Sequence, residues 1–181
     1  MVGLVVVSHS SRLAEGVVEL AREMGGATVA IEAAGGVEAG GALGTSATLI
    51  AAAIERAWSE DGVLVVMDLG SAVLSAEAAL ELLGEGRGER VLLCDAPLAE
   101  GAVIAAVAAG SGASLEAVAT EARRALEPKT KHLDRGAPKP GSDDAAPEPA
   151  PAPSLTEPFC LNGIPAAPPA PSARWPGRRP G

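Results

Sequence analysis

The segment MVGLVVVSHSSR, residues 1–12, places an unbroken apolar run directly before a cluster of polar residues. The apolar part, Val2–Ser8, is too short for a helix and does not alternate, which is typical of a strand covered on both faces. Three similar runs follow at intervals of about 30 residues: Ala27–Ala34, Gly62–Met67 and Arg90–Asp95. Such runs predict a parallel sheet, because crossover helices cover both of its faces.

Helical patterns lie between and after the four runs. The first has apolar side chains at helical spacing on Leu13, Val17, Leu20 and Met24, and two glycines end it. Further helices are expected from Thr45 or Ser46 through Trp58, from Ser71 through Leu83, from Pro97 to about Ala109, and from a capping Ser114 to about Leu126. The alternation predicts an α/β fold: a doubly wound, mainly parallel four-stranded sheet with helices on both faces.

The composition of the chain changes at Pro128. Of the 15 prolines, 14 lie in residues 128–181, where apolar side chains are too sparse to offset the entropy of ordering the chain. Residues 1–127 are long enough for one hydrophobic core. We therefore expect one folded domain over residues 1–127, followed by a Pro/Ala-rich disordered linker and tail over residues 128–181.

Charge and targeting signals exclude several classes of function. Residues 1–127 carry seven Arg, no Lys and 18 acidic residues, a net charge of −11 that disfavours binding to nucleic acid. The amino-terminal run lacks the basic region of a signal peptide and is too short to cross a bilayer, so we expect a cytoplasmic protein without membrane insertion. The two cysteines, Cys94 and Cys160, form neither a disulfide framework nor a metal-ligand cluster, and no metal is expected.

Polar residues follow each expected strand, where a doubly wound sheet gathers its functional groups. His9 follows the first strand and precedes a helix, so its ring is placed to act as a nucleophile while helix N–H groups bind an anion such as a phosphoryl group. Asp68, after the third strand, is the candidate to orient the His9 ring. The alternatives are a structural histidine for His9 and a helix cap or turn role for Asp68.

Hydroxyl side chains surround the same strand ends and are candidates to bind phosphoryl oxygens. They are Ser10, Ser11, Thr45 and Ser71, each of which is also a candidate helix cap. The glycine-rich loop Gly35–Gly44 opens a helix but matches neither a Walker motif nor a dinucleotide fingerprint. This loop is therefore as consistent with a flexible connection as with a phosphate cradle.

Four motifs, in this order, make the pattern specific: residues 3–10 (GLVVVSHS), 44–46 (GTS), 67–72 (MDLGSA) and 95–102 (DAPLAEGA). Together they resemble the phosphotransferase subunit of phosphoenolpyruvate-dependent dihydroxyacetone kinase, which belongs to the mannose-type enzyme IIA family. The resemblance covers essentially all of residues 1–127. It implies that His9 accepts a phosphoryl group from the histidine phosphocarrier HPr and passes it to ADP on a nucleotide-binding kinase subunit, so that dihydroxyacetone is phosphorylated at the expense of phosphoenolpyruvate.

The resemblance also implies partners and cofactors. Both kinase subunits, the nucleotide-binding one and the dihydroxyacetone-binding one, are expected partners, and the family implies a homodimer. No cofactor is expected on this chain itself, since ADP and ATP are held by the partner subunit. Longer family members continue into a domain like HPr, which motivates the hypothesis that residues 128–181 include the remnant of a truncated HPr-like domain.

Three other functions remain open from the sequence. A mannose-type enzyme IIA of a sugar-transporting phosphotransferase system would use the same His9 chemistry. A tetrapyrrole metal chelatase is a remote alternative, because Ser8–Arg12 is similar to a strand end of that family, although the domain has no second histidine. A regulatory protein that changes partners when His9 is phosphorylated would need the same histidine.

Overall fold

The structure, a computed structural model, describes residues 1–37 and 42–134 of the 181-residue chain. Its four strands form one sheet in the order β2-β1-β3-β4, and every neighbouring pair is parallel. The strands are β1 (Gly3–Ser8), β2 (Ile31–Gly35), β3 (Val63–Met67) and β4 (Val91–Cys94). The predicted fold class is confirmed.

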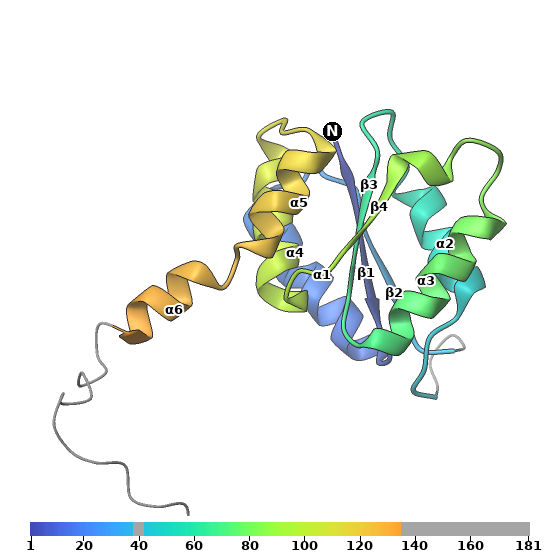
Figure 1. The fold of residues 1–181 in the computed structure, drawn as a ribbon, viewed down its shortest axis with the longest axis horizontal. Helices are drawn as coiled ribbons and strands as arrows, with labels where there is room; N and C mark the ends of the chain where they lie inside the picture. The colour runs from blue at the N-terminus through green and yellow to red at the C-terminus, as the bar shows by residue number, and fades with distance from the viewer. Residues whose placement is uncertain (38–41, 135–181) are drawn as a thin grey trace, which may run out of the picture. The chain divides into compact units, whose positions relative to one another are not determined.

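Helices cover both faces of the sheet. These helices are α1 (Ser11–Gly25), α2 (Ala47–Arg56), α3 (Gly70–Leu82), α4 (Leu98–Gly110) and α5 (Leu115–Arg123); a short 3-10 turn, η1 (Gly88–Arg90), precedes β4, and α6 (Glu127–Asp134) follows α5 without a buried residue. Figure 1 shows α1, α4 and α5 on one face and α2 and α3 on the other. This arrangement explains why β1 and β3 are apolar throughout rather than alternating.

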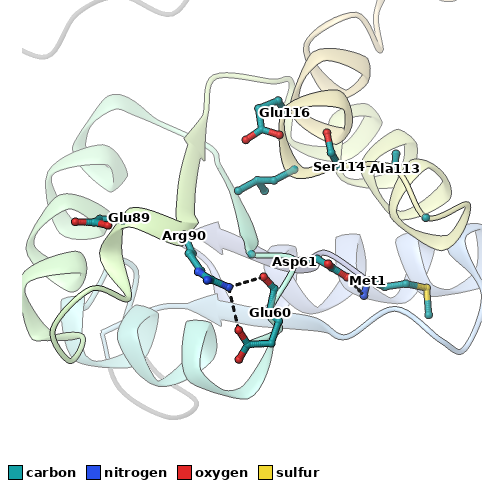
Figure 2. A pocket seen from close by; sticks show the side chains of 11 residues that line it. Met1, Glu60, Asp61, Glu89, Arg90, Ala113, Ser114 and Glu116 are labelled. Carbon is teal, nitrogen blue, oxygen red and sulfur yellow. Dashed lines mark hydrogen bonds and ion pairs between the residues drawn. The ribbon is translucent and has the colours of Figure 1, made fainter.

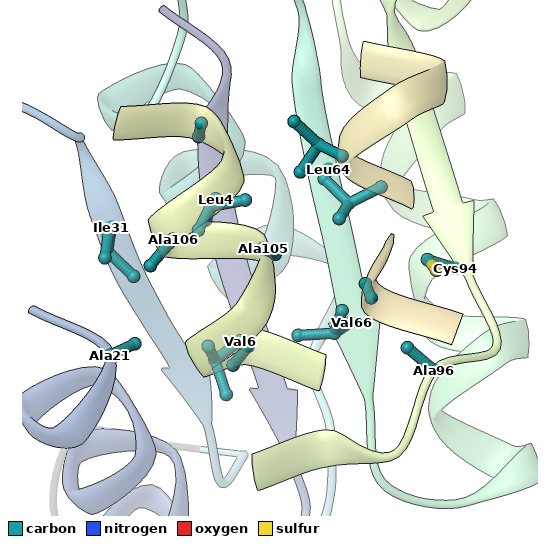
Figure 3. Close-up of a cluster of buried hydrophobic side chains, with 14 of the residues drawn as sticks. Leu4, Val6, Ala21, Ile31, Leu64, Val66, Cys94, Ala96, Ala105 and Ala106 are labelled. Atoms are coloured by element: carbon teal, nitrogen blue, oxygen red, sulfur yellow. The ribbon is translucent and has the colours of Figure 1, made fainter. Parts of the chain in front are cut away.

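Two hydrophobic cores lie on the two faces of the sheet. Leu4 and Val6 of β1 belong to the core under α1, α4 and α5, whereas Val5 and Val7 belong to the core under α2 and α3. In Figure 3 the first core brings β-strand side chains against small alanines of α4, among them Ala105. Alanines allow the helices to lie close to the sheet, so the core is filled mainly by strand side chains.

The buried face of α1 differs from the expected apolar stripe. Only Val17 of that stripe is buried, while Leu13, Leu20 and Met24 are about half exposed (48%, 50% and 59%). The buried positions are Ala14, Val17, Val18 and Ala21. The reason is the close contact between α1 and α4, where a Cβ on Gly25 would lie 2.5 Å from the Cβ of Ala106, so that small residues face the contact.

The helix ends agree with the expected caps in part. Ser46, not Thr45, is the N-cap of α2, and Ser114 caps α5 as predicted, its hydroxyl accepting from Ala117 N–H at 3.4 Å. Pro97 is the N-cap of α4, so that helix begins one residue later than expected. Helix α5 ends at Arg123, three residues before the expected Leu126.

A sixth helix occupies residues that were expected to be disordered. The chain forms α6 (Glu127–Asp134) instead of leaving regular structure at Pro128. Proline is tolerated in the first turn of a helix, because the first four N–H groups have no intrahelical partner. Glu127 pairs with Lys131 one turn later, and Lys129 pairs with Glu100 of α4. The rest of the predicted tail, residues 135–181, and the proposed HPr-like remnant lie outside the described residues.

Candidate functional site

The strand order places the first two candidate residues side by side. Because β2 and β3 lie on opposite sides of β1, the winding of the chain reverses between β1 and β3. Val7 of β1 pairs with Met67 of β3, so the residues that follow each strand meet at the same carboxyl edge. His9 and Asp68, 59 residues apart in the chain, are thereby brought into contact.

Asp68 holds the His9 ring through a direct hydrogen bond. His9 Nδ1 lies 3.0 Å from Asp68 Oδ1, which also accepts from Leu69 N–H at 2.7 Å. The other carboxylate oxygen, Oδ2, accepts from the backbone N–H of His9 at 2.8 Å and from the Ser8 hydroxyl at 2.9 Å. The side chains are 25% exposed for His9 and 13% for Asp68, so the acid is covered while the ring keeps an accessible edge.

These contacts keep Asp68 ionised. Burial acts to raise the pKa of Asp68, but the hydrogen bonds from the His9 backbone, the His9 ring, the Ser8 hydroxyl and the Leu69 backbone together lower the pKa below its ordinary value. An ionised carboxylate only accepts hydrogen bonds, so Nδ1 must carry the hydrogen of this contact. In the neutral ring Nε2 then keeps its lone pair, which is the form a nucleophile needs.

Ser71 contacts the opposite edge of the ring. Its hydroxyl lies 2.8 Å from His9 Nε2, and since Nε2 carries the lone pair, the hydroxyl donates. Ser71 is the second residue of α3, whose N-cap, Leu69, provides no side-chain cap for the first N–H groups. The start of the helix that carries Ser71 therefore lacks a side-chain cap, and a helix N-terminus of this kind suits an anion.

The remaining predicted residues make no hydrogen bond to the His9 ring within the described structure. Ser10 is the N-cap of α1 and accepts from Leu13 N–H at 3.4 Å, which matches its alternative as a capping residue. Ser11 opens α1 against the end of β2, where a Cβ on Gly35 would lie 2.6 Å from Ser11 Cα. Thr45 lies 2.7 Å from the Ser75 hydroxyl of α3, and this bond joins α3 to the segment before α2.

Sequence reasoning did not single out Ser8 as a site residue. Ser8 is a single hydroxyl residue at the end of an otherwise apolar strand. A serine in that position indicates only where the strand ends, so no feature of the sequence indicated a role in the site. Ser75 was missed because it lies within a helix and has no motif. Residues 38–41 of the glycine-rich loop Gly35–Gly44, for which the sequence indicates a flexible connection and a phosphate cradle equally, lie outside the described residues.

A hollow beside Asp68 opens along the ends of β3 and β4. It has a volume of about 510 Å³ and is lined by Met67, Asp68, Leu69, Val73, Asp95, Ala96, Pro97, Leu98, Arg123 and Leu126. Arg123 Nε bonds Asp95 Oδ1 at 2.5 Å, so its charge is engaged there. Arg12, in the first turn of α1, makes no ion pair with any described residue. Within the described structure, no arginine or lysine side chain is bonded to the His9–Asp68 pair.

Another pocket lies at the amino-terminal edge of the sheet, away from His9. It has a volume of about 440 Å³ and is lined by residues that include Asp61 and Glu116, and Figure 2 shows Arg90 bonded to the carbonyl and carboxylate oxygens of Glu60. Within residues 1–37 and 42–134 no three His, Cys, Asp or Glu side chains are grouped to hold a metal ion. No described helix is long and apolar enough to span a membrane.

The site lies within a region shared with a known protein family. A family model described as "EIIA-man: PTS system fructose IIA component" matches residues 3–119, which include His9, Asp68 and Ser71. The chain belongs to the EIIA-man family. The resemblance to a phosphotransferase subunit of dihydroxyacetone kinase is thereby confirmed at family level, and this membership sets the chain apart from the chelatases considered above.

Within the EIIA-man family, this chain is similar to phosphoryl donor subunits of dihydroxyacetone kinases. It is 51% identical over 136 residues to the "PEP-dependent dihydroxyacetone kinase, phosphoryl donor subunit DhaM" of Escherichia coli K12, covering 74% of this chain and 29% of the relative. It is 44% identical over 121 residues to "PEP-dependent dihydroxyacetone kinase 2, phosphoryl donor subunit DhaM" of Listeria innocua, covering 67% of this chain and 96% of that relative. The chain thus spans under a third of the E. coli protein and nearly all of the Listeria one.

A solved structure supports the fold of this EIIA-man domain. It is titled "Crystal structure of unknown function protein EF1359" and aligns with a TM-score of 0.61 and 36% identity. The alignment covers 68% of this chain and 95% of that chain. The aligned part of this chain therefore corresponds to nearly all of that solved chain.

Proposed function

We propose that this chain is the phosphoryl donor subunit of a phosphoenolpyruvate-dependent dihydroxyacetone kinase, with His9 as the phosphorylated residue. The observation that carries the proposal is the His9–Asp68 pair at the switch point of the sheet, with Nδ1 bonded to the carboxylate and Nε2 in contact with the Ser71 hydroxyl. The relatives, which are named as phosphoryl donor subunits of this kinase, indicate the system in which this chemistry operates. The proposed reaction class is phosphoryl transfer through a phosphohistidine intermediate.

The first step is uptake of the phosphoryl group. The lone pair on His9 Nε2 attacks the phosphorus carried by phosphorylated HPr, a new N–P bond forms, and the N–P bond of the donor breaks to return its electron pair to the donor ring. Asp68 holds the ring so that Nε2 points outward, and it stabilises the positive charge that the ring acquires when it is phosphorylated. Ser71 moves its hydrogen bond from Nε2 to a phosphoryl oxygen.

The second step delivers the group to ADP. A terminal phosphate oxygen of ADP attacks the phosphorus on His9, the N–P bond breaks, and ATP forms on the nucleotide-binding kinase subunit, which then phosphorylates dihydroxyacetone. Catalysis of phosphoryl transfer between two nitrogens, or from nitrogen to oxygen, depends mainly on positioning the reactants and stabilising charge. The uncapped start of α3 and the hydroxyls of Ser71 and the neighbouring Ser10 and Ser11 are the proposed phosphoryl-binding groups of this chain.

Partner proteins supply the positive charge that this site lacks. Because residues 1–127 carry a net charge of −11, we expect the cations that stabilise the transferred phosphoryl group to come from HPr and from the kinase subunits. Opposite charge also speeds the encounter of an acidic domain with a basic carrier surface. The proposed partners are HPr, the two kinase subunits and a second copy of this chain, and ADP and ATP stay on the partner.

Phosphoenolpyruvate-driven labelling tests the proposal. The full chain is incubated with phosphoenolpyruvate, enzyme I and HPr, and acid-labile phosphate is located by mass spectrometry, with His9→Ala as control. ADP-loaded kinase subunits and dihydroxyacetone are then added. We expect label on His9 that chases into dihydroxyacetone phosphate; label that forms but does not chase would move the chain to a sugar-transporting system or a regulatory role, and absence of label would refute phosphoryl transfer.

A further inference from the structure

Ser8 is the one fully buried polar residue among the described residues. Its exposed fraction is 0%, and it ends the strand whose other members are all buried. A buried hydroxyl is costly unless its hydrogen-bonding capacity is used, so its partners indicate why it is tolerated there. Hydrogen bonding, and not packing alone, therefore explains a serine at this buried position.

The hydroxyl of Ser8 joins two parts of the site. It donates to Asp68 Oδ2 at 2.9 Å and accepts from the backbone N–H of Ser10 at 3.1 Å. One bond reaches the acid that orients His9, and the other reaches the N-cap of α1. Ser8 thus bonds the groups on both sides of the nucleophile without touching the His9 ring.

The backbone around Ser8 leaves this hydroxyl little freedom. Ser8 pairs with Gly35 in the parallel ladder, and its carbonyl accepts from Gly36 N–H at 3.2 Å. With the strand end held and the hydroxyl bonded in both directions, the side chain has one arrangement that satisfies all its contacts. Because the Ser8 hydroxyl is fixed, its hydrogen bond can restrict the rotation of the Asp68 carboxylate that accepts it.

The distribution of bonds on Asp68 shows what this donor does. Oδ2 takes the bonds from Ser8 and from the His9 backbone, which leaves Oδ1 for His9 Nδ1 and Leu69 N–H. Without the Ser8 hydroxyl, Oδ2 keeps one donor, and rotation of the carboxylate about its last side-chain bond is less restricted. The ring contact at Oδ1 then loses part of its support.

We propose that Ser8 is a positioning residue for phosphoryl transfer: its buried hydroxyl locks the Asp68 carboxylate so that Oδ1 holds the hydrogen on His9 Nδ1 and leaves Nε2 as the nucleophile. The transfer part of this inference rests on the proposed function, while the effect on the ring and the carboxylate does not. Ser8 makes no contact with the transferred group. It acts through Asp68.

Variants at Ser8 separate this role from a purely structural one. Ser8→Ala removes the hydroxyl, and Ser8→Thr and Ser8→Val form a pair of nearly equal shape that differ in the presence of that hydroxyl. Ser59→Ala is the matched control, because the Ser59 hydroxyl also makes a hydrogen bond, to Gly62 O at 3.1 Å, but lies at the opposite edge of the sheet. Thermal unfolding is measured for each variant.

Three readouts are taken on the full chain. We expect Ser8→Ala and Ser8→Val to slow phosphoryl uptake from phosphorylated HPr about tenfold, and Ser8→Thr to stay within about threefold of the wild type. By ¹⁵N NMR the His9 ring should change from mainly Nδ1–H to a mixture of tautomers. By ¹³C NMR the titration midpoint of the Asp68 carboxyl should move to higher pH, because a bond that favours its ionised form is gone.

Unchanged tautomer and Asp68 midpoint in both Ser8→Ala and Ser8→Val would overturn the inference, whatever happens to the rate. Equal behaviour of the Thr and Val variants would overturn it as well, since shape and not the hydroxyl would then matter. If Ser8→Ala fails to fold, the Thr and Val pair carries the test. The NMR readouts need no phosphoryl donor, so a wild-type chain that takes no label would refute the proposed function without deciding the role of Ser8.

Discussion

Replacing Asp68 with Asn tests the central contact of the site. The Asp68 carboxylate accepts four hydrogen bonds, two on each oxygen: from Ser8, from the His9 backbone, from the His9 ring and from Leu69. An amide of the same shape has one oxygen and one NH₂ group, so it can accept at only one of the two positions. Asp68→Asn therefore cannot satisfy all of these donors in either orientation.

Each orientation of the amide damages the site differently. If the oxygen faces His9 Nδ1, the NH₂ group lies against the His9 backbone N–H, and two donors oppose each other. If the NH₂ group faces Nδ1, the ring must accept there and carry its hydrogen on Nε2, which removes the nucleophilic lone pair. Either way the negative charge is lost, and a hydrogen bond to a charged group contributes about 1.5–3 kcal/mol.

A loss of about 2 kcal/mol from the transition state lowers the rate about thirtyfold. The assay is rapid-quench uptake of acid-labile phosphate from phosphorylated HPr at neutral pH. Asp61→Asn serves as the control, because Asp61 pairs with the chain's amino terminus at the opposite edge of the sheet. An Asp68→Asn rate within threefold of the wild type, in a variant that unfolds at the same temperature, would refute the reasoning.

Three further predictions concern the ring, the sheet and the acid. Ser71→Ala should slow phosphoryl uptake about fivefold in the same assay, because the variant loses one hydrogen bond that contributes about 1 kcal/mol. An unchanged rate would contradict a role for this hydroxyl. Gly3→Ala should lower the free energy of unfolding in urea by about 1–3 kcal/mol or more, because its Cβ would lie 1.8 Å from Ala57 O, whereas Gly16→Ala, in open space on α1, should raise it slightly; similar effects of both would be inconsistent with the clash. The lowered pKa of folded Asp68 means that its stabilisation is present above the unfolded pKa and lost as pH falls through the folded one, so wild type and Asp68→Asn should differ in stability at neutral pH and converge in acid by calorimetry; a constant difference would argue against an ionised Asp68.

Much of the fold could be predicted because each strand has a recognisable pattern in its own local sequence. Valine and leucine runs without alternation occur where both faces of a strand are covered, and β1 and β3 are buried throughout. The start of β2 was less predictable: the apolar pattern begins at Ala27, but pairing with β1 begins only at Ile31. The buried face of α1 could not be read at all, because leucines and alanines share the helix and only the contact with α4 selects the small residues.

By itself, the amino-acid sequence determined the α/β class, the limits of the strands to within a few residues and the pair of candidate side chains, His9 and Asp68, because runs of apolar residues and the polar residues that end them are local features of the chain. The tertiary structure alone decided that Asp68 bonds Nδ1 of the ring, that the Ser71 hydroxyl contacts Nε2, that Ser8 bonds Asp68, and that Thr45 bonds Ser75. Those contacts join residues about 30 to 60 positions apart, and their partners are set by the parallel register of β1 and β3 and the packing of α3, which no local pattern encodes.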